Sequence, residues 1–167
     1  MNITLDRLLA SRDARKAMQE KLLGMYPEST LVCLTVVMPG SVKRNDLSLT
    51  IARAATEALR HAFHAETEHF MERDLETGFE AYALVKVEEV EAKRRVCDVE
   101  DIHPLGRLFD LDVISRQTGT PISRSDVGRK GRTCLLCHQE ARYCMRNKTH
   151  SQQELLNEIR RLVAQYA

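Results

Sequence analysis

The sequence contains no tryptophan, and aromatic residues make up only 5% of its 167 residues. Proteins that bind single-stranded nucleic acid stack the bases on aromatic side chains, so this chain offers few such platforms. Charge does not compensate, because 25 Lys and Arg residues against 24 Asp and Glu residues leave a net charge of +1. Proteins that bind nucleic acid usually carry a clear basic surplus. The composition therefore argues against a nucleic-acid partner.

Long hydrophobic runs are also absent. The longest strongly apolar run, Leu31–Met38, is far shorter than the roughly 20 residues that cross a bilayer, and the first residues lack the basic and apolar regions of a signal peptide. Five cysteines, an odd number without such a signal, favour reduced thiols or metal ligands over disulfides. We expect a soluble cytoplasmic protein with no membrane partner, folded as one domain over residues 1–167.

Hydrophobic periodicity predicts an α+β fold. An apolar, β-branched run at 31–38 that ends at Pro39-Gly40 predicts a buried strand, and apolar residues at helical spacing predict a helix from Asn45 or Asp46 to about Phe63. The other expected elements are a helical turn at 5–9, a helix capped by Ser11 and ended by Gly24, a polar connection at 66–80, strands at 81–87, 107–115 and 121–124, and helices at 88–101 and 155–166. We expect the strands to form a small mixed sheet with helices packed on it and a helical C-terminal segment.

Asp110 and Asp112 are the first candidates for chemistry. Side chains two residues apart on a strand point to the same face, roughly 6 to 7 Å apart, so both carboxylates can reach one divalent cation. Phosphoryl-transfer sites hold magnesium in this way, and water and substrate phosphate complete its coordination. Just before the pair, Gly106 allows close backbone approach and Arg107 offers a guanidinium for phosphate oxygens. The alternative interpretation is a solvated strand face.

Other residues are candidates for phosphate binding. Gly40, Ser41 and Lys43 lie between a predicted strand and a predicted helix, where the N-terminal amides of the helix favour an anion. Their spacing is not that of a P-loop, and an ordinary turn is the alternative. Arg12, in the N-terminal helical layer, either faces the site or is a surface arginine.

A cysteine-rich basic segment at about 129–150 is predicted to be helical. It contains three cysteines and a histidine, and thiolate and imidazole are the ligands that zinc prefers, although the spacing is not that of a common zinc finger. If the segment is one helix, the cysteines lie within about 60° of each other and form an apolar face. A nucleophilic cysteine is a third interpretation, but no base is identifiable beside any thiol. The candidate ligands are Cys134, Cys137, Cys144 and His150.

Long stretches of the sequence carry the motifs of one family. The motifs are His103-Pro-Leu-Gly-Arg-Leu-Phe-Asp-Leu-Asp-Val113, Ser123-Arg124-x-Asp126, Arg132-x-Cys-Leu-Leu-Cys137, Cys144 and Lys148-Thr-His150, preceded by Leu8-Leu-x-Ser-Arg-Asp-x-Arg15 and Thr35-Val-Val-x-Pro-Gly40 with Lys43. With these motifs the chain resembles the holo-citrate lyase synthases, which are the apo-citrate lyase phosphoribosyl-dephospho-CoA transferases. The resemblance runs from about residue 5 to 160. It is most specific over 103–150, whereas 66–101 carries no recognised motif.

The resemblance implies a nucleotidyltransferase-like fold and a nucleotidyltransferase-type reaction. In this family, the triphosphoribosyl form of dephospho-CoA donates its phosphoribosyl end to a serine of the citrate lyase acyl-carrier (gamma) subunit, and pyrophosphate is released. Asp110 and Asp112 would hold magnesium against the triphosphate, with Arg107 and Lys43 on the phosphates. Arg124 opens a segment, 124–148, with seven basic residues against two acidic ones. That segment suits the donor, an acidic carrier surface or only solvent.

The sequence leaves two kinds of alternative open. The same chemistry would serve another carrier, such as that of malonate decarboxylase. A non-catalytic assembly factor for the lyase, or a zinc-bearing module that binds nucleic acid, would need neither Asp110 nor Asp112. An assembly factor would therefore keep its binding to the carrier when either aspartate is changed to Asn.

Overall fold

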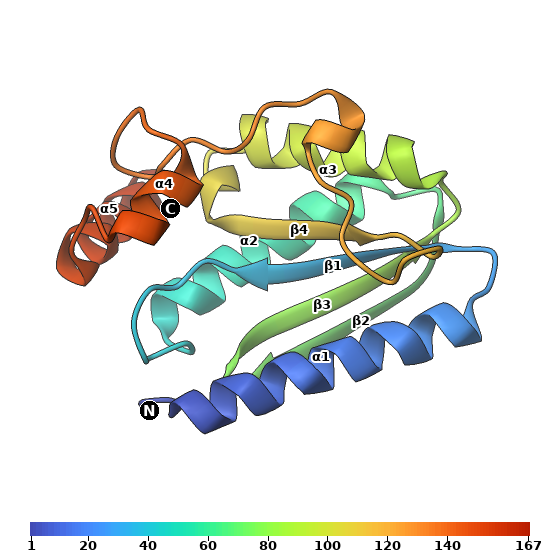
Figure 1. Ribbon diagram of the computed structural model, residues 1–167, viewed down its shortest axis with the longest axis horizontal. Coiled ribbons are helices and arrows are strands. Elements are labelled where there is room, and N and C mark those ends of the chain that lie inside the picture. The colour runs from blue at the N-terminus through green and yellow to red at the C-terminus, as the bar shows by residue number, and fades with distance from the viewer.

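The computed structural model describes all residues from Met1 to Ala167. Its centre is a four-stranded sheet in the order β2-β3-β1-β4 (Figure 1). The strands are β1 (Thr30–Val36), β2 (Thr67–Leu75), β3 (Gly78–Val85) and β4 (Phe109–Ile114). All three pairings are antiparallel. The α+β class predicted from the sequence is confirmed, but the sheet is antiparallel throughout rather than mixed.

Helices cover both faces of this sheet (Figure 1). On one face, α2 (Asp46–Ala62), α3 (Glu89–Ile102) and α5 (Gln152–Tyr166) contribute to the larger apolar core. The strand residues in this core alternate along the chain, for example Val32 and Leu34 on β1. Asn45 caps α2 by accepting a hydrogen bond from the Ser48 N–H at 2.8 Å, as its predicted position before the helix requires. The predicted α2 and β1 are confirmed.

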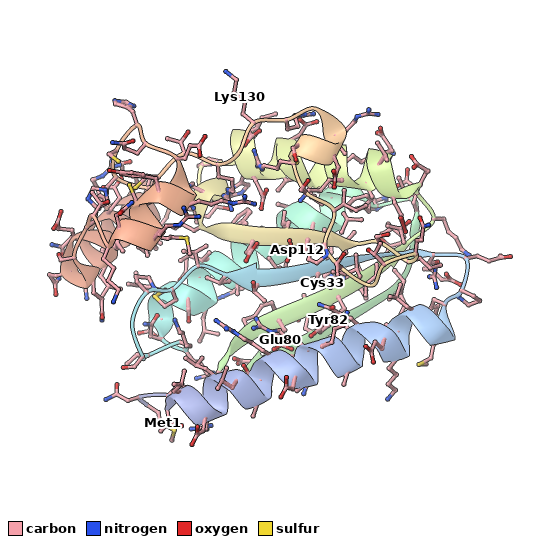
Figure 2. All side chains as sticks on the ribbon, in the orientation of Figure 1. Met1, Cys33, Glu80, Tyr82, Asp112 and Lys130 are labelled. Carbon is pink, nitrogen blue, oxygen red and sulfur yellow. The ribbon has the colours of Figure 1, made fainter.

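The other face of the sheet is covered by α1 (Leu5–Met25), and its apolar core is small. Leu22 of α1 packs there with Leu31 and Ile114 from the strands. This core occupies one end of the sheet face. Cys33 and Tyr82 also belong to this core, and beside them the face carries carboxylates such as Glu80 and Asp112; Figure 2 shows these four residues on the side of the strands toward α1. A polar face beneath a helix leaves room for a site.

The N-terminal region is one helix, not the two predicted helical pieces. Thr4 caps it by accepting a hydrogen bond from the Arg7 N–H. Ser11, predicted to be a helix cap, lies inside α1, and its hydroxyl donates to the Leu8 carbonyl at 2.9 Å. A serine hydroxyl can bond a carbonyl of the preceding turn, so it need not interrupt a helix. The predicted break was therefore wrong.

Two predictions about the sheet were also wrong. The connection expected at 66–80 contains the edge strand β2, of which no residue is buried. β2 pairs only with β3, so it lies at the edge of the sheet, where few side chains need to be apolar. Several of its polar side chains form ion pairs instead, such as Asp74 with Arg44 at 2.8 Å. The strand expected at 121–124 is a single bridge between Ile114 and Pro121. Proline lacks an N–H with which to extend a ladder, and the chain continues into a short 3-10 helix, η2 (Ser125–Val127).

The cysteine-rich segment is mostly irregular. Only α4 (Ala141–Asn147) is helical, although helix was expected over about 129–150. Thr133 and Glu140 form an isolated antiparallel bridge that folds the chain between them into a loop. A second 3-10 helix, η1 (Gly106–Leu108), precedes β4. None of the helices is both long and apolar enough to span a membrane.

Candidate active site

The register of the edge strand β4 directs two carboxylates toward α1. Phe109, Leu111 and Val113 belong to the larger core. The residues between them, Asp110 and Asp112, therefore face the opposite side, because successive side chains on a strand alternate. Asp110 lies opposite Thr35 of β1, and Asp112 lies opposite Cys33. The structure thus brings the predicted pair together on one face, under α1.

The two carboxylates have few protein partners. The Thr35 hydroxyl donates to Asp110 at 3.5 Å, and Asp112 forms no hydrogen bond or ion pair. Burial of Asp112, followed by the negative charge of Asp110, raises the pKa of the Asp112 carboxyl to about 6. Two adjacent carboxylates with a single long hydrogen bond between them and the protein fit a divalent cation with oxygen ligands, since such an ion supplies positive charge.

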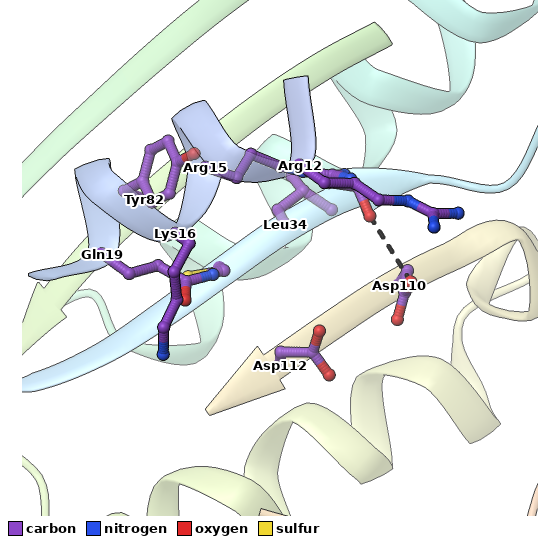
Figure 3. A pocket seen from close by; sticks show the side chains of 10 residues that line it. Arg12, Arg15, Lys16, Gln19, Leu34, Tyr82, Asp110 and Asp112 are labelled. Atoms are coloured by element: carbon purple, nitrogen blue, oxygen red, sulfur yellow. Dashed lines mark hydrogen bonds between the residues drawn. The ribbon is translucent and has the colours of Figure 1, made fainter. Parts of the chain in front are cut away.

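A basic wall from α1 closes one side of this pair (Figure 3). Arg12, Arg15, Lys16 and Gln19 follow one another at helical spacing and line a cavity of about 310 Å³ that both aspartates share. Arg15 lies 3.9 Å from Glu80, which is buried in the sheet face. Arg12 is exposed, so its guanidinium is available to a ligand.

Lys16 and Gln19 were missed by the sequence analysis, as were Cys33 and Tyr82 from the floor of the same cavity. A signal for the helix residues is present. Polar residues at positions i, i+3, i+4 and i+7 of a helix share one face, and a polar face that packs toward a sheet indicates a ligand site. The floor residues give no such signal, because cysteine and tyrosine in strands are ordinary core residues.

Asp110 lines two further cavities. One, of about 500 Å³, also contains Asp112, Lys93 of α3 and Arg124. The other, of about 390 Å³, contains Arg107, Cys134 and His150. The three cavities therefore meet at the Asp110 carboxylate.

The residues predicted around the pair differ in their availability. Arg107 lines the 390 Å³ cavity, and its Nε donates to the Thr133 carbonyl at 2.7 Å. Arg124 lines the 500 Å³ cavity, but it donates to Glu100 at 2.8 Å and to Asp101 at 3.0 Å. Gly106 packs against the end of α3, where an added Cβ would lie 2.7 Å from the Val99 carbonyl oxygen. Gly106 is therefore needed for packing.

The turn after β1 reaches the 390 Å³ cavity only through Val37, Met38 and Pro39, and Gly40, Ser41 and Lys43 line none of the three cavities. Lys43 donates to the Met38 carbonyl at 2.6 Å, and burial, followed by the charge of Arg12, lowers the pKa of its ammonium. The Ser41 hydroxyl donates to the Asn2 side chain at 3.2 Å. Gly40 adopts a left-handed conformation, φ 87°, and packs against the side chain of Gln152. The structure does not bring these three residues to the aspartates.

The cysteines and the histidine of the 134–150 segment converge. The ligand atoms of Cys134, Cys137, Cys144 and His150 all lie within 4.8 Å of one another, and the Cys137 and Cys144 sulfurs are 3.4 Å apart. His150 Nε2 is buried without a hydrogen-bond partner. Because the residues come from the loop before α4, from α4 itself and from the connection between α4 and α5, they do not form the face of one helix. The cluster is compatible with zinc, which binds tetrahedrally to thiolate and imidazole.

The electrostatics of this cluster also favour a cation. Burial raises the pKa of the Cys134 thiol, but hydrogen bonds from the backbone N–H groups of Leu136 and Cys137 and from neighbouring thiols outweigh it, and the pKa falls to about 7. A lowered pKa favours the thiolate, which is the form that binds metal.

Comparison with known proteins identifies the family. The model of the apo-citrate lyase phosphoribosyl-dephospho-CoA transferase family matches residues 3–166. The apo-citrate lyase phosphoribosyl-dephospho-CoA transferase of Escherichia coli O139:H28 is 34% identical over 164 residues, which cover 96% of this chain and 88% of that protein. Protein CitXG of Haemophilus influenzae is 34% identical over 163 residues, which cover 96% of this chain but 35% of that longer protein. The chain belongs to the apo-citrate lyase phosphoribosyl-dephospho-CoA transferase family and is a transferase.

Proposed function

We propose that this transferase attaches the phosphoribosyl-dephospho-CoA group of triphosphoribosyl-dephospho-CoA to a serine of the citrate lyase acyl-carrier subunit. The serine oxygen bonds to the innermost phosphorus of the triphosphate, the bond from this phosphorus to the pyrophosphate oxygen breaks, and the serine proton passes to a base. The observation that carries the proposal is the Asp110–Asp112 pair, of which Asp110 lines all three cavities and Asp112 lines two.

Asp110 and Asp112 are the proposed ligands of a magnesium ion. When bound, the ion would neutralise charge on the triphosphate and on the departing pyrophosphate. Their few hydrogen-bond donors support this role, and so does the raised pKa of Asp112, because repulsion between the carboxylates is relieved by a cation. The pair also fixes the reacting end of the donor relative to β4, which aligns it with the incoming serine.

Arg12 and Arg107 are the proposed phosphate-binding residues, and each lines a different cavity that Asp110 also lines. Arg12 lines the cavity under α1, and Arg107 lines the cavity beside the cysteine cluster. A guanidinium presents several donors in one plane, which suits phosphate oxygens. Gly106 and Arg124 support this arrangement by fixing the segments around β4. Gly40, Ser41 and Lys43 would act through the turn that they stabilise.

We also propose that the Cys134, Cys137, Cys144 and His150 cluster binds one structural zinc ion. The proximity of the four ligand atoms and the unpartnered His150 Nε2 support this proposal. The cluster joins the loop before α4, the seven-residue helix α4 and the connection that leads to α5, and this segment contributes little to the apolar core. A metal ion there would fix the wall of the 390 Å³ cavity, which contains Cys134, Cys144 and His150 together with Asp110.

The experiment that tests the transferase is intact-mass analysis of the apo acyl-carrier subunit after incubation with this protein, magnesium and the donor. We expect a gain equal to the mass of the prosthetic group with wild type, and a rate lower by at least about a hundredfold with Asp110→Asn or Asp112→Asn. Asp13→Asn is the matched control, because Asp13 is exposed on α1 and lines none of the three cavities.

Each outcome distinguishes between functions. No mass gain with a competent donor and carrier would contradict the proposal for this partner. A gain with only the carrier of malonate decarboxylase would keep the chemistry and change the substrate. A gain that survives both aspartate substitutions would move the catalytic site away from β4.

A further inference from the structure

Lys93 is a buried lysine on the face of α3 that packs against β4. It is only 5% exposed, and it shares this face with Cys97 and Glu100, which are also buried. The three residues follow one another at i, i+4 and i+7, so they form one stripe. Figure 1 shows α3 beside β4, the strand that carries the two aspartates. Burying an ammonium group is costly unless it has a charged partner.

No protein group forms an ion pair with Lys93, although its positive charge acts against the rise in the pKa of the Asp112 carboxyl. Lys93 donates no hydrogen bond and has no carboxylate oxygen within 4 Å. Glu100, the acid on the same helix face, already accepts from the Leu111 N–H at 3.0 Å and pairs with Arg124 at 2.8 Å and Arg132 at 3.4 Å. Only two side-chain polar atoms are inaccessible to solvent and lack a hydrogen-bond partner, namely Thr56 Oγ1 and His150 Nε2. The Lys93 ammonium is not among them, so it opens into the cavity that it lines.

This cavity, of about 500 Å³, also contains Asp110 and Asp112. Of the other cations of its wall, Arg142 is exposed to solvent, whereas Arg124 and Arg132 are bound to the protein. Arg124 pairs with Glu100 and Asp101, and Arg132 donates to the Phe109 carbonyl at 2.7 Å and to the Gly106 carbonyl at 2.8 Å. Lys93 therefore differs from both, because its positive charge is buried beside the aspartates and remains free for a ligand.

We propose that Lys93 binds the pyrophosphate portion of the donor, donating to a phosphate oxygen on the α3 side of the Asp110–Asp112 pair. This assignment rests on the proposed function. An ammonium has three donors and no acceptor, so it suits an oxygen-rich anion. Negative charge accumulates on the pyrophosphate as its bond to the transferred group breaks, and a fixed, desolvated cation stabilises that charge. The cavity under α1 is left for the transferred part of the donor.

The test is calorimetric titration of pyrophosphate, in the presence of magnesium, into wild type, Lys93→Met and the control Arg94→Met. Arg94 is the next residue of α3 and is exposed, so the control removes the same charge outside the cavity. We expect wild type and the control to bind alike, and Lys93→Met to bind about ten- to a hundredfold more weakly, as the loss of a charged hydrogen bond implies. Met replaces Lys with little change of volume and removes a buried charge, so the variant should fold and melt no lower than wild type.

Two results would overturn the assignment. If Lys93 only neutralises the aspartates, Lys93→Met will bind magnesium alone more tightly and pyrophosphate as tightly as wild type. If wild type itself fails to bind pyrophosphate with magnesium, both this assignment and the proposed reaction site fail together. Lys93→Arg adds a further criterion, because it keeps the charge and should retain most of the affinity that Lys93→Met loses.

Discussion

Asp112 lies two residues from Asp110 on the same face of β4, and neither carboxylate forms an ion pair with a basic side chain of the protein. Burial and the Asp110 charge raise the Asp112 pKa to about 6, above the ~3.9 of an unfolded aspartate. The folded chain therefore binds more protons than the unfolded chain between these two values. The contribution of Asp112 to the free energy of unfolding is therefore fully present below about pH 4 and is lost as the pH rises through about 6.

The first prediction is that Asp112→Asn stabilises the protein at neutral pH while it removes activity. A difference of about two pH units corresponds to about 3 kcal/mol of unfolding free energy, so the variant should exceed wild type by up to this amount at pH 7.5 and by little at pH 4. Urea unfolding at both pH values measures it, with Asp13→Asn as the control. An equal pH dependence of the unfolding free energy in wild type and Asp112→Asn would show that ionised Asp112 does not destabilise the folded state.

The second prediction concerns magnesium. A ligand that binds only the folded state raises its stability, so magnesium should raise the melting temperature of wild type at pH 7.5. The effect should be absent in Asp112→Asn and should weaken below about pH 6, where Asp112 is protonated. Melting curves with magnesium at several pH values test this. A magnesium effect that persists in both Asp110→Asn and Asp112→Asn would place the ion elsewhere.

The third prediction concerns Glu100, which joins α3 to β4 and to the 124–132 segment. It is 6% exposed, and Arg124 and Arg132 both pair with it. Glu100→Gln leaves the two guanidinium groups without a buried counter-charge, so we expect a loss of about 3–5 kcal/mol of unfolding free energy. Asp98→Asn is the control on the same helix, since its exposed pair with Arg129 should contribute less than about 1 kcal/mol. Similar losses in the two variants would contradict the role of Glu100.

The fourth prediction compares two glycines. Gly106→Ala places a Cβ against the backbone of Val99 and Glu100, which cannot move aside as a flexible side chain does, so it should cost about 1–3 kcal/mol of unfolding free energy. Gly24→Ala, inside α1 with no atom within 4 Å of the added Cβ, should stabilise by about 0.5–1 kcal/mol. Chemical denaturation of both variants gives the comparison. A neutral Gly106→Ala would mean that the end of α3 yields easily.

The elements that could be predicted from the sequence are those in which burial alone determines the hydrophobic pattern. β1 is buried on both faces and α2 has one apolar face, so their sequences show it directly. β2 could not be predicted, because an edge strand without buried residues has no apolar period. The aspartate pair was found because spacing on a strand is local. Lys93 was not, because a lysine in a helix is normally exposed and only tertiary packing buries it.

The last prediction is that zinc removal loosens the C-terminal part of the chain. Protein purified without oxidation should contain about one zinc per chain, and Cys137→Ser or His150→Ala should lower that content, whereas Cys97→Ala, at a buried cysteine outside the cluster, should not.

Chelation should lower the melting temperature of wild type and increase proteolysis within 129–150, because ligands that held one ion would become separate thiols and an unpartnered imidazole. Cys97→Ala should respond to the chelator as wild type does, since all four ligands remain. Protein that takes up no zinc after reconstitution, yet keeps its melting temperature and its resistance to proteolysis, would show that packing alone holds the four side chains together. The 390 Å³ cavity beside Asp110 would then not depend on a metal ion for its shape.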